Sequence, residues 1–174
     1  EAIAIQNGII VAVGSNDDII NLRGSNTRVV DAEFATILPG FHDAHLHLRS
    51  LAARLQSVEC GPTTVRSIAE LQMRLREAAT GLERGTWIRG AGYDEFVLAE
   101  QRHPNRHDLD AALAEYPIKL SHRSGHLWVM NSLALREAEI NQNTEEPPGA
   151  TILRELPSGE PDGILMGMDH YIQA

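Results

Sequence analysis

The 174-residue sequence has little cysteine, few aromatic residues and no long apolar run. Cys60 is its only cysteine, which excludes an internal disulfide and favours a reducing, cytoplasmic location. We interpret Cys60 as a small buried hydrophobic residue rather than a nucleophile. No apolar run approaches the roughly 18 residues that a membrane span needs, and the first residues do not resemble a signal peptide. We therefore expect no membrane partner.

Basic residues are also scarce. The sequence contains 15 Lys and Arg but 24 Asp and Glu, which gives a formal net charge of −9. A nucleic-acid-binding surface needs clustered Lys and Arg, so we expect no nucleic-acid partner. The 43% hydrophobic and 22% charged residues are ordinary for a soluble globular protein. The sequence does not begin with Met, and we expect it to be part of a longer chain.

The first 38 residues have a β pattern. Apolar runs at 2–5 and 9–13 flank Asn7-Gly8, and this arrangement predicts a hairpin. Ser15, followed by acidic residues, predicts the start of a short helix that ends near Gly24. Further apolar runs predict a second strand pair, over residues 27–31 and 34–38.

After Pro39-Gly40 the sequence predicts alternating strands and helices. Ser67 and Glu70 predict a capping box for a helix that ends near Gly81. The other expected elements are strands at 41–48, 87–89 and 118–122, helices at 49–57, 108–115 and 131–140, a polar loop at 141–149, and a hairpin from 151–156 and 163–166. This alternation indicates a mixed α/β fold.

His45 and His47 are candidate metal ligands. Residues two apart lie on the same face of a strand, so both imidazoles could reach one ion, whereas on a helix they would point apart. Asp43 lies on the same predicted face and could orient the imidazoles, while His42 faces away. The spacing alone is weak evidence, because 8 histidines in 174 residues often produce such a pair by chance.

The residues around this pair strengthen the interpretation. Residues 38–48, LPGFHDAHLHL, resemble the Pro-Gly-Phe-x-Asp-x-His-x-His signature of the amidohydrolase superfamily, and residues 8–14 resemble the strand upstream of it. Later segments resemble the branch called amidohydrolase family 3. These segments are residues 87–94, Leu109-Asp110, Gly125-His126 and 129–132, together with Gly149, Arg154, Gly159, Pro161 and Gly163 at and before the predicted terminal hairpin.

The resemblance implies a (β/α)8 metal-dependent hydrolase barrel beside a small β-sandwich. Residues 1–38 would form part of the β-sandwich, 39–66 the start of the barrel, and 67–174 an α+β insertion of the barrel domain. A divalent metal ion, zinc above all, would be held in part by His45 and His47, with Asp43 supporting them. His126 would line the substrate pocket, or would equally well bridge a loop.

The implied reaction is hydrolysis of a non-peptide C–N bond, in an amide or cyclic amide, by metal-activated water. The substrate would be a small molecule, and the resemblance leaves a homo-oligomer open. Zinc usually takes at least three protein ligands. The family's lysine, further histidines and aspartate have no counterpart here, so we expect the segment alone to be inactive without the remainder of the full-length chain.

Two alternatives remain beside this hypothesis. The first is a non-catalytic chain whose histidines are structural or bind metal incidentally. The second is a small β-barrel oxygenase or cupin-type protein, which the sequence disfavours because residues 49–57 contain no acidic ligand after His47. The remaining histidines, His103, His107, His122 and His170, are interpreted as surface or loop residues.

Overall fold

The computed structural model describes residues 1–168, and the chain divides into two compact units, one from Glu1 to His45 and one from Leu46 onward. In the first unit, β1 (Ala2–Gln6) and β2 (Ile9–Gly14) form the predicted antiparallel hairpin. Helix α1 (Asn16–Ile20) follows, and the Ser15 hydroxyl accepts a hydrogen bond from the Asp18 backbone N–H. The hairpin and the N-cap at Ser15 are therefore confirmed.

The second strand pair predicted in the first unit is wrong. Residues 27–31 and 34–38 form no strand, and Glu33 and Phe34 adopt positive φ angles of 47° and 66°. Apolar alternation stabilises a strand only where one face is buried. Here the apolar side chains remain exposed, Phe34 fully so, and burial therefore supplies no free energy to hold a sheet.

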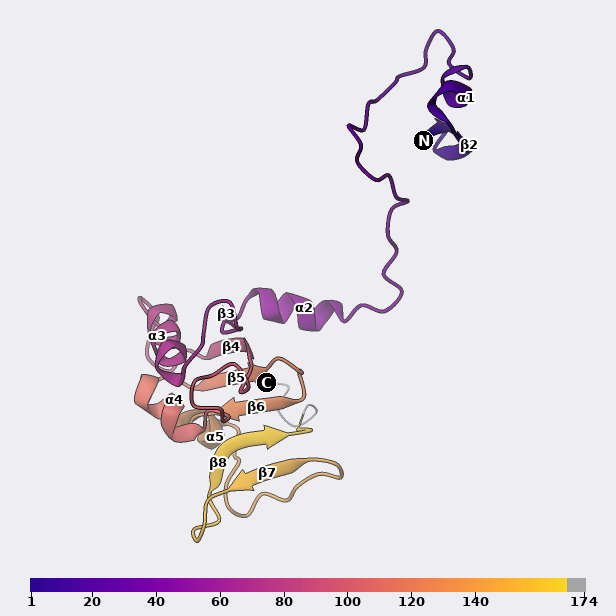
Figure 1. Ribbon diagram of the computed structural model, residues 1–174. Coiled ribbons are helices and arrows are strands. Elements are labelled where there is room, and N and C mark those ends of the chain that lie inside the picture. Colours follow the sequence, from indigo (N-terminus) through magenta and orange to yellow (C-terminus); the bar gives the residue numbers. More distant parts are fainter. Residues whose placement is uncertain (169–174) are drawn as a thin grey trace. The chain divides into compact units, whose positions relative to one another are not determined.

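The second unit contains a six-stranded sheet (Figure 1). Its strand order is β3-β4-β5-β6-β8-β7, with β3, β4 and β5 parallel and the remaining neighbours antiparallel. The strands are β3 (Val58–Glu59), β4 (Ile88–Tyr93), β5 (Ile118–His122), β6 (Leu127–Met130), β7 (Thr151–Arg154) and β8 (Pro161–Met166). The coarse mixed α/β class is thus confirmed, together with strands β4, β5, β7 and β8, whereas the sequence prediction missed β3 and β6.

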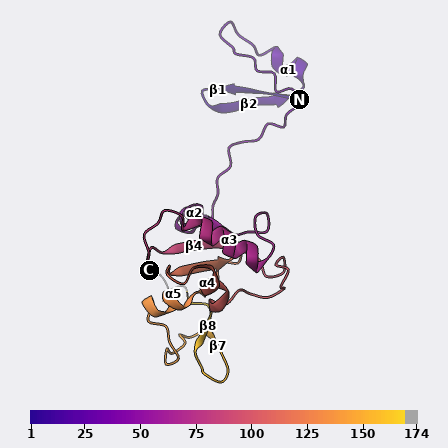
Figure 2. The same cartoon turned by 90° about the vertical axis from the view of Figure 1, so that its left-hand side faces the viewer.

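The described residues of this unit, 46–168, form four helices (Figures 1 and 2), namely α2 (Leu48–Leu55), α3 (Ile68–Ala78), α4 (Arg106–Leu113) and α5 (Ser132–Glu137). Helices α3 and α4 are the crossover connections between the parallel strands β3, β4 and β5. Each of the four lies where a helix was predicted, within a few residues. Ser67 caps α3 as expected, but the Glu70 carboxylate accepts from the Arg66 N–H, one residue before the N-cap.

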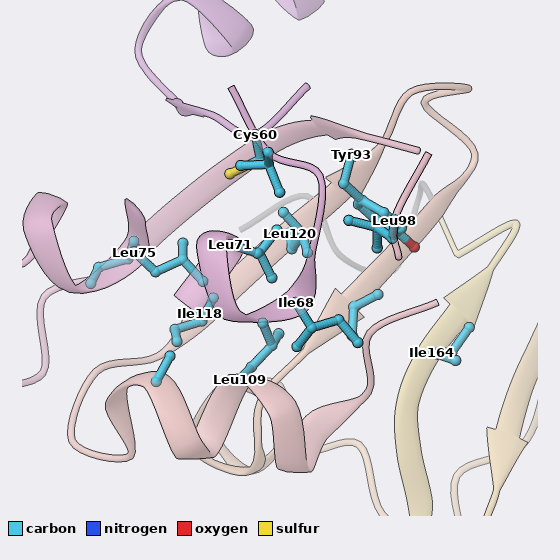
Figure 3. Close-up of a cluster of buried hydrophobic side chains, with 14 of the residues drawn as sticks. Cys60, Ile68, Leu71, Leu75, Tyr93, Leu98, Leu109, Ile118, Leu120 and Ile164 are labelled. Atoms are coloured by element: carbon cyan, nitrogen blue, oxygen red, sulfur yellow. The ribbon is translucent and has the colours of Figure 1, made fainter. Parts of the chain in front are cut away.

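Two apolar cores form around the sheet. The larger one joins α3 and α4 to β4 and β5, as Figure 3 shows for Leu71, Leu75, Leu109 and Leu120. It also encloses Cys60, which is fully buried as predicted, and burial raises the pKa of its thiol to about 11. The smaller core joins α5 to β6 and β8. In the described residues, no helix has the length and apolarity that crossing a bilayer requires.

Candidate functional site

The predicted metal ligands lie in an exposed segment without regular structure. Residues 41–47 do not form the predicted strand, and α2 begins directly after His47, which is its N-cap with φ −87° and ψ 70°. A parallel strand needs hydrogen-bonding neighbours, and no described strand pairs with this segment. The same-face argument for His45 and His47 therefore fails in this structure, while their ligand role stays a prediction.

Asp43 makes a local hydrogen bond in this segment. One of its carboxylate oxygens, Oδ1, accepts from the backbone N–H of His45 at 3.0 Å. Such a turn around an aspartate fixes the backbone two residues on. This contact orients the main chain at His45, whereas the predicted support of the imidazoles by Asp43 stays a prediction.

His126, the predicted substrate-pocket residue, lies in the exposed turn between β5 and β6. Its backbone N–H donates to the Ser124 hydroxyl at 3.3 Å, and its carbonyl accepts from the Gly167 N–H at 3.1 Å. The main chain of His126 thus ties the turn to the end of β8. A role for its imidazole in substrate binding stays a prediction.

A different polar cluster forms where the parallel strands β4 and β5 end. A register shift between Ala91 and Tyr93, at Gly92 with φ 94°, places Tyr93 opposite His122. A bulge of this kind needs a residue that tolerates positive φ, and it redirects the side chains that follow. Asp94 and Glu95 come directly after β4. In α/β sheets the carboxyl ends of parallel strands are the usual place for a ligand.

Glu95 lies at the centre of this cluster, between two imidazoles. Its Oε2 is 2.7 Å from His122 Nε2, and its Oε1 is 3.8 Å from His103 Nε2. The far nitrogen of each ring is also hydrogen-bonded, since Tyr93 Oη lies 3.0 Å from His103 Nδ1, and His122 Nδ1 lies 2.8 Å from Ser124 Oγ and accepts the Ser124 backbone N–H at 3.2 Å. Because His122 Nδ1 accepts, its Nε2 is the nitrogen that donates to Glu95, whereas His103 Nε2 lies beyond hydrogen-bond distance of that carboxylate.

Asp94 is the most buried charged group of the cluster, with its side chain 4% exposed. Its carboxylate accepts from Arg123 Nη1 at 2.7 Å and from the Phe96 N–H at 3.1 Å. The hydrogen bond from Arg123 is the main reason why the pKa of Asp94 lies below its usual value. Asp94 is thus held ionised, and Arg123 neutralises it.

Burial affects two of the neighbouring rings. The pKa of His103 is lowered, chiefly because burial disfavours the imidazolium, although Glu95 opposes this shift. Burial also raises the pKa of Tyr93, whose side chain is inaccessible in the core beside Leu98 (Figure 3). The surroundings of His103 therefore favour its neutral imidazole, which is the form that can bind a cation.

One sequence interpretation is corrected here. His122 was expected at the surface or in a loop, yet it is the last residue of β5 and its side chain is only 13% exposed. His103 lies in a loop, as predicted, with its side chain 25% exposed. The sequence held a usable signal, because His122 ends one predicted strand and Asp94 comes shortly after another, and these two strands are parallel neighbours. His107 is 62% exposed, as predicted, and His170 lies outside the described residues.

Comparisons with known proteins agree on one family. The sequence profile of the amidohydrolase family matches residues 28–172. This range includes the segment with Asp43, His45 and His47 and extends over both parallel crossovers of the second unit.

Similar individual proteins have related descriptions. The chain is 32% identical over 95% of its length to N-substituted formamide deformylase of Arthrobacter pascens and 29% identical over 95% to the putative amidohydrolase YtcJ of Bacillus subtilis. It superposes, with 25% identity over 97% of its length and a TM-score of 0.50, on an uncharacterized metal-dependent hydrolase from Pyrococcus horikoshii OT3. The chain spans 30%, 31% and 31% of these proteins, respectively.

Proposed function

Because the chain belongs to the amidohydrolase family, in its family 3 branch, we propose that the protein hydrolyses a non-peptide C–N bond in a small-molecule amide or cyclic amide. The observation that carries this proposal is the His45–His47 pair behind Pro39-Gly40, inside the range that the family profile matches. The deformylase among its relatives is named for an N-substituted formamide, and this makes simple formamides a reasonable first class of substrate.

The metal in this proposal is a divalent ion, with zinc the first choice. The residues present fit it chemically, because His45 and His47 are exposed imidazoles and neutral imidazole is a common zinc ligand. When bound, such an ion lowers the pKa of a water and polarises a carbonyl. Two imidazoles are fewer than the three protein ligands that zinc usually takes, so residues outside this chain would complete the site.

The chain's own residues have distinct parts in this proposal. His45 and His47 hold the ion, and Asp43 fixes the backbone at His45 through the 3.0 Å hydrogen bond that it accepts. His126 offers an imidazole for the substrate from the β5–β6 turn. The assignment of residues 1–38 to a β-sandwich, 39–66 to the start of a barrel and 67–174 to its insertion is part of the same proposal, and so is a cytoplasmic location.

The test uses the protein with the remaining family residues present and compares His45→Ala/His47→Ala with the neighbouring His42→Ala as a matched control. We expect the double variant to lose one equivalent of zinc, measured by mass spectrometry of the metal. Its hydrolysis of a panel of N-substituted formamides should fall by a factor of at least about 10³. The control variant should keep both properties.

Two results would contradict the proposal. Unchanged zinc content in the double variant would remove His45 and His47 from the ligand set. Lost zinc without any hydrolytic activity in the parent protein, on formamides or cyclic amides, would favour a non-catalytic chain with structural metal ligands. The 174 residues alone should show no hydrolysis, because their His45–His47 pair is an incomplete site.

A further inference from the structure

The turn that carries His126 is bound to the end of the neighbouring strand β4. Two consecutive acidic residues after β4, Asp94 and Glu95, each hold one residue at the start of this turn. Arg123 Nη1 donates to Asp94 Oδ2 at 2.7 Å, and His122 Nε2 donates to Glu95 Oε2 at 2.7 Å. Hydrogen bonds to an ionised carboxylate are shorter and stronger than neutral ones. Both side-chain pairs therefore fix the turn to β4.

A continuous series of hydrogen bonds leads from Glu95 to the main chain of His126. His122 Nδ1 accepts from the Ser124 backbone N–H at 3.2 Å and from the Ser124 hydroxyl at 2.8 Å. The hydroxyl oxygen in turn accepts from the His126 backbone N–H at 3.3 Å. Glu95 thus fixes the ring of His122, this ring fixes Ser124, and Ser124 fixes the backbone that bears the His126 imidazole.

The groups at the base of this series are shielded, whereas the residue at its end is exposed. The side chains of Glu95 and His122 are 16% and 13% exposed, while His126 lies at the surface. A shielded ion pair or hydrogen bond is less weakened by water than a surface one. The turn follows the carboxyl end of β5, the edge where ligands bind in α/β sheets. A side chain that binds a ligand needs a supporting shell of this kind.

We propose that Glu95, acting through His122 and Ser124, positions the His126 imidazole for the substrate. This inference rests on the proposed function, in which His126 offers its imidazole to a small-molecule amide. Glu95, His122 and Ser124 are positioning residues, because they act on the substrate through His126. Their removal changes how the substrate is bound and leaves the proposed metal ligands intact.

The experiment is a double-mutant cycle in the protein with the remaining family residues present. We expect His126→Ala to raise KM for an N-substituted formamide about 10-fold, and Glu95→Ala about 5-fold, with kcat within about twofold of the parent. The double variant should have the KM of His126→Ala alone, because Glu95 then has no imidazole to position. A merely structural role of Glu95 would multiply the two losses instead. Zinc content should be the same in all variants.

Glu95→Gln tests positioning by rescue. Its amide oxygen can still accept from His122 Nε2, so KM should return to within about twofold of the parent although the charge is gone. Glu155→Ala is the matched control, because Glu155 Oε1 lies 2.6 Å from His107 Nε2 and forms a carboxylate–imidazole pair outside the turn. This control should keep the parental KM. Circular dichroism checks the fold of each variant.

Hydrogen exchange, measured by mass spectrometry, follows the turn without substrate. Residues 123–127 should exchange at least about 10-fold faster in Glu95→Ala and at the parental rate in Glu95→Gln, while residues 118–121 of β5 stay unchanged. Should Glu95→Ala not fold, Ser124→Ala replaces it in the cycle and in the exchange measurement, because it removes the oxygen that binds the His126 N–H.

Three kinetic results would overturn the positioning role. They are an unchanged KM in His126→Ala, losses that multiply in the double variant, and a Glu95→Gln variant as impaired as Glu95→Ala. A parent protein that hydrolyses no amide contradicts the proposed function instead. Hydrogen exchange then decides the positioning role, which is overturned if residues 123–127 exchange in Glu95→Ala as slowly as in the parent.

Discussion

Asn131 shows what a single side chain does in this fold. It is fully buried, and its amide oxygen accepts from the backbone N–H groups of Ile118 and Ala134, both at 3.0 Å. Its amide nitrogen donates to the carbonyls of Leu113 and Tyr116, at 3.2 and 2.9 Å. The Asn131 side chain therefore caps α5 and also binds the first residue of β5 and the last residue of α4.

We predict that Asn131→Ala destabilises the second unit by about 3 kcal/mol, because it leaves buried backbone groups without partners. Asn131→Asp keeps the acceptor for Ile118 and Ala134 but places a buried carboxylate oxygen against the Leu113 and Tyr116 carbonyls, and it should cost at least as much as Asn131→Ala. Asn143→Ala, at an exposed position, should change little. Urea unfolding followed by circular dichroism measures each value. A loss below about 1 kcal/mol for Asn131→Ala would mean that water replaces these hydrogen bonds.

The residue scale also shows how far sequence reasoning reaches a site. The His45–His47 spacing could be found in the sequence. The strand that we predicted to align the two rings, however, does not form in this structure. Strand pairing depends on partners that no local pattern contains. For Glu95 and His122 the reverse holds. Glu95 comes just after β4 and His122 ends β5, so their proximity follows from the pairing of these two strands, a long-range feature of the fold that neither residue indicates in the sequence.

At the scale of elements, local signals predicted helices well. The caps Ser15, Ser67 and Asn131 all accept the expected backbone N–H, because capping depends only on neighbours within three residues. Strand β6 was missed, since its residues 127–130 are too few for a clear alternation and are largely buried on both faces. Residues 27–31 and 34–38 show the opposite error, because strands were predicted in these exposed runs and none forms.

Strand β8 approaches its neighbours so closely that only glycine fits at one position. Gly163 has φ 103°, and a Cβ there would lie 2.5 Å from the Met130 carbonyl oxygen and 2.8 Å from the Arg106 nitrogen. We predict that Gly163→Ala costs at least about 2 kcal/mol of stability, from strain and from backbone collision together.

Gly159→Ala is the control for the collision in this element. Gly159 has φ 75° in the β7–β8 turn, but a Cβ there would have nothing within 4 Å, so this variant measures the conformational strain alone. We expect about 1 kcal/mol for it. Thermal unfolding of both variants gives the comparison. Equal losses in the two would show that the chain at Gly163 relaxes away from Met130 and Arg106.

At the scale of the whole molecule, the division into two units has a consequence for proteolysis. Trypsin needs an extended, accessible segment, and Arg28 lies in an exposed stretch without helix or strand. Arg89 and Lys119 lie within the parallel strands β4 and β5, where the backbone is paired. We predict that limited digestion cuts at Arg28 long before it cuts at either strand residue.

The second unit should survive this cut as a folded product, because its sheet and both apolar cores draw only on residues after His45. Mass spectrometry identifies the product, and its unfolding temperature should match that of the intact chain within a few degrees. Digestion in urea serves as the control and should cut all basic sites at similar rates. Early cleavage at Arg89 or Lys119 without urea would contradict this prediction. It would show that the buried sheet opens as easily as the exposed stretch around Arg28.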